Sequence, residues 1–175
     1  MHCPWPIQGK VPEGILLTET AEDCHVAVTL SPGGDNALHL VPQCLVLGVG
    51  CRKGTPAEAI ERAVEQHLAP KLCFPQAFCK VCSIDLKQEE PGLVAFCRAA
   101  GLPFETYSAE ALARLPGDFT PSDFVAQVTG VDNVCERSAV LGSRGGELME
   151  KKTKGAGVTL AVARMPLTLE WRWQE

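Results

Sequence analysis

The stretch LVLGVGCRKGT, residues 45–55, decides the fold class. Its first half is a continuous apolar run, which predicts a strand buried on both faces of a sheet. Its second half passes through glycines to Thr55-Pro56, which predicts a helix N-cap and first helical position, with Glu58 completing a capping box. Apolar side chains then recur at helical spacing at Ile60, Ala63, Val64 and Leu68. A buried strand that turns into an amphipathic helix is the repeating unit of α/β sheets.

Strand and helix signals alternate along the rest of the chain. Short runs rich in β-branched and aromatic residues predict strands at 25–30, 80–84, 104–107, 147–151 and 158–163, with a turn at 31–35. Further helices are expected to open at Pro91, Ser108, Thr120-Pro121 and Val134, and Gly101 and Gly130 are placed to end two of them. In the helix after Thr120, the side chains expected to point inward are Phe124, Val125 and Val128. The last two strands can pair as a hairpin, so the sequence predicts a three-layer α/β/α sandwich with a mixed, mostly parallel sheet.

Composition places the chain among ordinary globular proteins, with 175 residues, 46% hydrophobic and 21% charged. A net charge of -5 argues against a general nucleic-acid binder. No apolar run approaches the roughly 20 residues of a membrane helix, and the N-terminus lacks the apolar core of a secretory signal. Nine cysteines, odd in number and irregular in spacing, indicate a reducing cytoplasm.

The only close cysteine pair is Cys79 and Cys82. It leads into a predicted strand, whereas a thioredoxin-like pair begins a helix, whose dipole lowers the thiol pKa. A zinc site would need two more ligands at suitable spacing. We therefore expect both thiols to be reduced and metal-free, with Cys82 buried, and we rank a metal or redox module last.

The first candidate functional segment is the turn at residues 48–55. Its glycines let the backbone approach a ligand, and the helix N-terminus that follows offers free N–H groups. Arg52 and Lys53 add two full charges at the same place. A tight turn without a ligand is the alternative, and it is favoured for the glycine pattern taken alone.

Two further segments carry charge at predicted strand ends. Residues 85–90 include Asp85, Lys87 and Glu90, whose carboxylates suit helix capping and general-base chemistry equally well. Residues 151–157 form a predicted Lys- and Gly-rich hairpin loop, for which a solvated turn is the alternative. Because parallel strands end at one edge of a sheet, we expect the segments at 48–55 and 85–90 to open on the same edge. The hairpin loop at 151–157 joins them in one cleft if the strand before it runs in the same direction.

These segments together resemble the C-terminal domain of the CbiG family, the cobalt-precorrin-5A hydrolases of anaerobic cobalamin synthesis. The matching stretches run in order over about 120 residues, which makes them far more specific than any single motif. They are LVLGVGCRKGT (45–55), SIDLKQEEPGL (83–93), Ser108 before its helix, PSDFVAQVTGVDNVCE (121–136), and Lys151 followed by GAGVTLAVA (155–163). The resemblance implies a linker at 1–42, the α/β domain at 43–164 and a C-terminal tail at 165–175.

The resemblance also implies a reaction. Water opens the δ-lactone of cobalt-precorrin-5A and acetaldehyde leaves to give cobalt-precorrin-5B, a hydrolysis acting on carbon–carbon bonds. Cobalt arrives with the substrate, so no protein-bound metal or cofactor is expected. Full-length members carry an N-terminal domain for which this chain has no room, so a fragment or shortened homologue is expected. The expected partners are the cobalt-corrin substrate, that N-terminal domain and a second copy in a homodimer, with no nucleic acid and no membrane.

Candidate residues for this reaction fall into two groups. The candidate bases for water are Asp85, Glu90 and Glu136. The candidate substrate-binding residues are Gly48, Gly50, Cys51, Arg52, Lys53, Lys87, Ser108 and Lys151. The cations among them can pair with peripheral carboxylates of the macrocycle, and the N–H groups of residues 48–52 can serve as oxyanion donors. The alternative function is a non-catalytic tetrapyrrole carrier of the stand-alone CobE type, which needs the same basic pocket but no carboxylate beside the reacting carbonyl.

Overall fold

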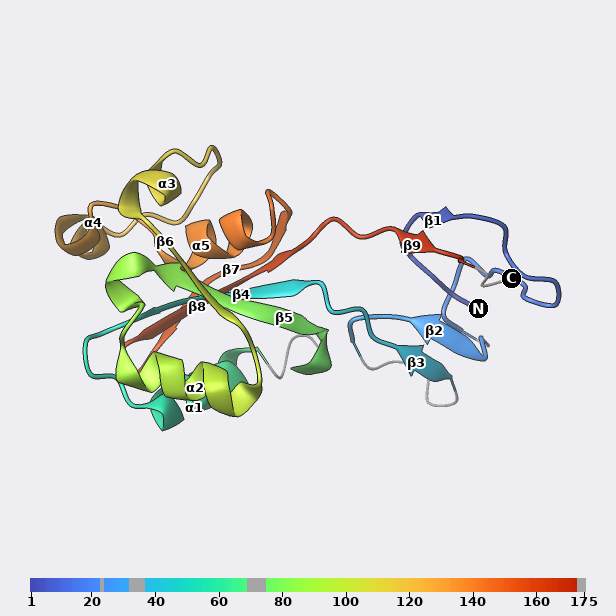
Figure 1. Cartoon of the computed structure of the whole chain (residues 1–175), viewed down its shortest axis with the longest axis horizontal. Helices are drawn as coiled ribbons and strands as arrows, with labels where there is room; N and C mark the ends of the chain where they lie inside the picture. Colours follow the sequence, from blue (N-terminus) through green and yellow to red (C-terminus); the bar gives the residue numbers. More distant parts are fainter. Residues whose placement is uncertain (23, 32–36, 69–74, 173–175) are drawn as a thin grey trace. The chain divides into compact units, whose positions relative to one another are not determined.

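The computed structural model describes residues 1–22, 24–31, 37–68 and 75–172 (Figure 1). The chain divides into two compact units. The sheet unit comprises Cys44–Lys71 and Phe78–Pro166, and the small unit comprises Met1–Gln43, Leu72–Ala77 and Leu167–Glu175. Within the described residues, no helix is long and apolar enough to cross a lipid bilayer.

The sheet unit is built on a five-stranded sheet in the order β6-β5-β4-β8-β7. Strands β4 (Leu45–Cys51), β5 (Phe78–Ile84) and β6 (Phe104–Tyr107) pair in parallel. Strand β8 (Val158–Arg164) runs antiparallel to β4, and β7 (Glu147–Gly155) runs antiparallel to β8. Strand β7 therefore points the same way as β4, and the mixed, mostly parallel sheet is confirmed.

Helices cover both faces of this sheet (Figure 1). On one face lie α1 (Ala57–His67) and α2 (Pro91–Ala100), which pack against each other. On the other lie α3 (Ala109–Ala113), α4 (Asp123–Thr129) and α5 (Cys135–Gly142), of which α5 packs on β4, β5 and β8. Helix α2 buries Leu93, Phe96 and Cys97, and it ends at Gly101 in the left-handed conformation, the residue predicted to end it. The three-layer architecture is confirmed.

Local boundaries differ from the sequence predictions in three places. Thr55 does not cap α1, because its hydroxyl donates to the carbonyl of Arg52, and Pro56 takes the N-cap position. Helix α4 begins at Asp123, three residues later than predicted. Strand β7 extends to Gly155, so residues 152–155 of the predicted loop lie in a strand. The remaining turn, Ala156-Gly157, has φ angles of 49° and 81°, which suit a two-residue hairpin.

The small unit contains short strands. Strand β1 (Ile7–Gln8) pairs in parallel with β9 (Leu169–Glu170), so part of the predicted tail is paired with the N-terminal segment. Strand β2 (Val26–Val28) pairs in parallel with β3 (Leu38–Leu40). A short η1 turn (Pro75–Ala77) completes the described part of this unit. Most of the turn predicted at 31–35 lies outside the described residues.

The Cys79–Cys82 pair lies on β5, and its two thiols have separate surroundings. Cys79 donates to the carbonyl of Leu45 and sits 3.8 Å from the sulfur of Met165. Cys82 is fully buried, as predicted, and burial raises the pKa of its thiol to about 12. That environment keeps Cys82 protonated and favours a packing role.

Candidate functional site

The three segments singled out in the sequence line one cleft of about 1070 Å³ at the carboxyl ends of β4 and β5. Residues 50–54 supply one part, residues 86, 87 and 89–91 a second, and residues 152 and 154–159 a third. They meet because β4, β5 and β7 point the same way, so their carboxyl ends share one edge. The predicted convergence is confirmed. Helix α4 adds a further wall that the sequence did not predict.

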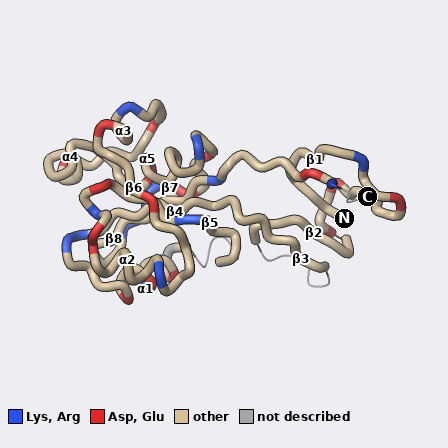
Figure 2. Tube along the Cα trace, in the orientation of Figure 1, with Lys and Arg blue, Asp and Glu red and all other residues tan. Residues whose placement is uncertain are grey.

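One side of the cleft is cationic. Arg52 and Lys53 follow β4, and Lys154 lies near the end of β7. All three are exposed and make no ion pair within the described part of the chain. Figure 2 shows basic and acidic residues interleaved along the trace of the sheet unit. An unpaired cationic wall suits a ligand that carries several carboxylates.

Another part of the cleft lining is apolar. Phe124 and Val128 of α4 are 69% and 63% exposed, and Leu86 of the η2 turn (Asp85–Lys87) is 65% exposed. The prediction that Phe124 and Val128 point inward is wrong. Their spacing of four residues does place them on one helix face, but that face forms the cleft wall. Exposed apolar side chains gathered in a hollow are typical of a ligand site.

Glu90 is the one candidate base that lines the cleft. Its side chain is 5% exposed, and its two oxygens accept from different donors. Lys87 Nζ lies 2.8 Å from one oxygen, and the backbone N–H of Gly54 donates to the other at 2.7 Å. These contacts, that with Lys87 first, lower the pKa of Glu90. The carboxylate is thus held as an anion that ties the turn after β4 to the start of α2.

The lowered pKa of Glu90 predicts that the contribution of this residue to the free energy of unfolding depends on pH. A depressed pKa stabilises the fold above the unfolded value of about 4.3, and this contribution disappears as pH falls through the folded value. We expect Glu90→Gln to lower the free energy of unfolding by about 1–2 kcal/mol at pH 7, with the deficit shrinking below pH 4. Urea denaturation at a series of pH values measures this. The exposed neighbour variant Glu89→Gln should show no such trend, and a deficit that is constant with pH would contradict the assignment.

The remaining candidate bases do not line the cleft. Asp85 is exposed and accepts a hydrogen bond from the N–H of Leu86 at 2.8 Å. Glu136 is fully buried at the start of α5 and is held by donors from other segments. Of the three candidate bases, only Glu90 is placed where it could contact a ligand in this cleft.

The predicted substrate-binding residues are divided in the same way. Those that line the cleft are Gly50, Cys51, Arg52, Lys53 and Lys87. Gly48 instead packs under α5, Ser108 caps α3 by accepting from the N–H of Ala111, and Lys151 lies 3.8 Å from Asp118. Burial raises the pKa of the Cys51 thiol, so it faces the cleft protonated.

The predicted oxyanion donors are partly committed elsewhere. The N–H of Arg52 donates to the carbonyl of Gly157 at 3.2 Å. This hydrogen bond joins the turn after β4 to the β7–β8 hairpin and so fixes the position of Arg52. The N–H of Arg52 is therefore not free to stabilise an oxyanion. The basic hairpin residues that do reach the cleft are Lys152 and Lys154, rather than the predicted Lys151.

The match to a known family covers the sheet unit. Residues 45–163 fit the family described as cobalamin synthesis G C-terminus. The chain belongs to this family. Its matched range contains every segment that lines the cleft.

Similar proteins have related names. The chain is 37% identical over 125 residues to cobalt-precorrin-5A hydrolase of Salmonella typhimurium and 34% identical over 132 residues to that of Priestia megaterium. These matches cover 71% and 75% of this chain, which spans only 36% and 35% of those hydrolases. It is also 35% identical to protein CobE of Sinorhizobium sp, covering 71% of this chain and 82% of that protein. A solved CobE structure aligns with a TM-score of 0.62 at 29% identity, covering 71% of this chain and 92% of CobE.

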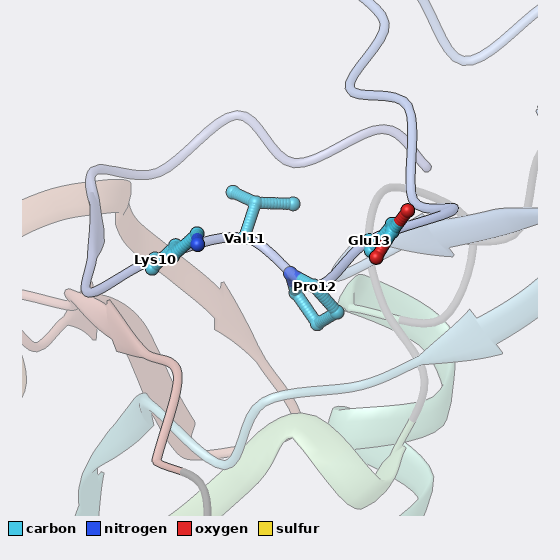
Figure 3. A pocket seen from close by; sticks show the side chains of 4 residues that line it. All are labelled: Lys10, Val11, Pro12 and Glu13. Carbon is cyan, nitrogen blue, oxygen red and sulfur yellow. The ribbon is translucent and has the colours of Figure 1, made fainter.

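A second hollow, of about 420 Å³, lies in the small unit (Figure 3). It is lined by four consecutive residues, Lys10, Val11, Pro12 and Glu13. It falls outside the range that matches the family. Among the described residues, no three His, Cys, Asp or Glu side chains gather in a way that could hold a metal ion.

Proposed function

We propose that the cleft binds a cobalt-corrin intermediate of cobalamin synthesis, and that this chain supplies substrate binding for cobalt-precorrin-5A hydrolysis. The observation that carries the proposal is the mixed apolar and cationic lining of the cleft. Phe124, Val128 and Leu86 form an apolar wall, while Arg52, Lys53 and Lys154 form a cationic wall. A corrin ring is flat and apolar across its faces and carries carboxylates around its rim. The ring face suits the first wall and the rim suits the second.

Lactone opening also needs a water molecule activated by a base. Glu90 is positioned for ligand contact, but its lowered pKa makes it a weak proton acceptor. Its contacts with Lys87 and Gly54 suit it to shape the cleft. We therefore propose that this chain binds the substrate. Water would be activated by the part of the hydrolases that this chain does not span.

A carrier of the CobE type is the second candidate, favoured by the long overlap with CobE. Both candidates bind a corrinoid, so turnover separates them. The test titrates the chain with cobalt-precorrin-5A by absorption spectroscopy and then assays acetaldehyde with and without the N-terminal domain of a full-length hydrolase. We expect binding by the chain alone and acetaldehyde only when both are present. Binding without acetaldehyde in either mixture would favour the carrier, and no binding would overturn the proposal.

A substitution of Arg52 tests whether the cationic wall binds the ligand. Because its guanidinium is unpaired and faces the cleft, Arg52→Ala should weaken cobalt-precorrin-5A binding roughly three- to fivefold, or about 1 kcal/mol, at low salt. The difference should shrink as ionic strength rises, because screening weakens the lost attraction. Titrations at several salt concentrations measure this, with exposed Arg114→Ala as the matched control outside the cleft. A loss that does not depend on salt would argue against charge pairing.

A further inference from the structure

The apolar wall of the cleft is weakly packed into the fold. Helix α4, which carries Phe124 and Val128, has no buried residue. Val125 packs against the small cluster of Ile84, Leu112, Val131 and Val134. The position of α4 must therefore depend strongly on the segments that flank it. The segment before α4 contains Thr120, and the contacts of this residue are unusually dense.

Thr120 is held at three atoms by buried groups. Its N–H and its hydroxyl both donate to the carboxylate of Glu136, each at 2.8 Å. Its carbonyl accepts from the side-chain amide of Asn133 at 2.8 Å, and the amide oxygen of Asn133 accepts from the N–H of Glu136. Glu136 is 0% exposed and Asn133 is 1% exposed. A buried carboxylate whose oxygens are satisfied by backbone and hydroxyl donors is a rigid anchor.

The same carboxylate also contacts strand β7. Glu136 accepts from the backbone N–H of Lys152 at 2.6 Å. Strand β7 shifts register between Glu150 and Thr153, and an irregularity of this kind takes backbone groups out of the ladder. The Lys152 ammonium then reaches back to the carbonyls of Thr120 and Pro121, at 2.7 Å and 3.3 Å. Glu136 and Lys152 thus join β7 to the entry of α4.

We propose that Glu136 is a positioning residue that sets the place of the apolar wall by tying Thr120 to Lys152. Its buried carboxylate takes no part in the chemistry of the cleft. It holds the segment that enters α4 against β7, and α4 carries Phe124 and Val128 into the lining of the cleft. Its effect on ligand affinity rests on the proposed function, whereas its effect on α4 does not.

The test is hydrogen exchange followed by ligand titration. Glu136→Gln keeps the size of the side chain but replaces one accepting oxygen by an NH₂ group, which cannot accept from Thr120 or Lys152. We expect amides of residues 120–130 to exchange at least tenfold faster, while amides of β4, β5 and β8 keep their protection. A uniform rise across the sheet would show a general packing role and would overturn the proposal, as would unchanged exchange.

Three milder variants keep the proposal testable if the Glu136→Gln protein does not fold. Thr120→Val removes the hydroxyl donor and should accelerate exchange in residues 120–130, whereas Thr120→Ser keeps the donor and should match wild type. Lys152→Met removes the ammonium contacts but keeps the backbone N–H, so its effect should be smaller than that of Glu136→Gln.

The ligand arm separates this proposal from the proposed function. If wild type binds cobalt-precorrin-5A, Glu136→Gln should bind it at least fivefold more weakly. Equal affinity, despite faster exchange in residues 120–130, would overturn the link between Glu136 and the cleft. Failure of wild type to bind would overturn the proposed function, and the exchange data would still decide whether Glu136 positions α4.

Discussion

Replacing Gly48 by alanine is expected to destabilise the sheet unit by about 3 kcal/mol or more. Gly48 lies in the middle of β4, directly under the first residue of α5. A Cβ atom at this position would come within 1.8 Å of the carbonyl oxygen of Cys135 and within 2.9 Å of the Cβ of Ala139. Since the nearest atom belongs to the backbone, no side-chain rotation relieves the clash. Helix α5 would have to move off β4, β5 and β8, which it covers.

The matched control is Gly50→Ala, two residues along the same strand. There a Cβ atom would meet the hydroxyl oxygen of Thr159 at 2.5 Å, and that side chain can rotate away. We expect a cost of about 1 kcal/mol for this variant. Urea denaturation of both proteins measures the difference. If Gly48→Ala is as stable as Gly50→Ala, α5 does not seat on β4 as described.

Removing the apolar wall is expected to abolish most of the affinity for a cobalt-corrin. Phe124 and Val128 are exposed in the free protein and would be covered by the ring face. The double variant Phe124→Ala and Val128→Ala loses about 2–3 kcal/mol of apolar contact, which corresponds to a roughly 30- to 150-fold larger dissociation constant. Its free energy of unfolding should change little, because both side chains are mostly in solvent.

The control for this variant is Leu38→Ala in the small unit. Leu38 is 62% exposed, close to the value of Val128, but it does not line the cleft. Absorption titrations with cobalt-precorrin-5A should show wild-type affinity for the control. If the double variant also keeps wild-type affinity, the macrocycle does not lie on α4 and the orientation proposed for it is wrong.

The sequence predicted the sheet and most helices because their signals are local. The apolar run at 45–49, Pro91 at the start of α2 and Ser108 at the start of α3 each act on neighbouring backbone atoms, and all were located correctly. Convergence of the segments after β4 and β5 also followed, since parallel strands joined by a helix open on one edge. The hairpin segment joins them because β7 runs in the same direction as β4, which the sequence did not decide.

What the sequence could not show depends on contacts between distant segments. The periodicity of α4 identifies an apolar face at Phe124 and Val128 but not whether that face meets the core or a cleft. The role of Glu136 depends on Thr120 and Lys152, which are 16 residues away on either side. Lys151 and Lys152 are neighbours in a basic run, and the contacts of Lys152 with Glu136 and Thr120, which place it in the cleft lining, come from distant segments.

The position of the cobalt ion in a crystal of the complex tests the central claim most directly. Cobalt scatters anomalously at its own absorption edge, so a cobalt-precorrin-5A molecule bound to the chain marks its site without reference to the ring density. The account predicts one anomalous peak inside the cleft, among the side chains of Phe124, Val128, Arg52 and Lys154. A peak at any other place on the chain would contradict it.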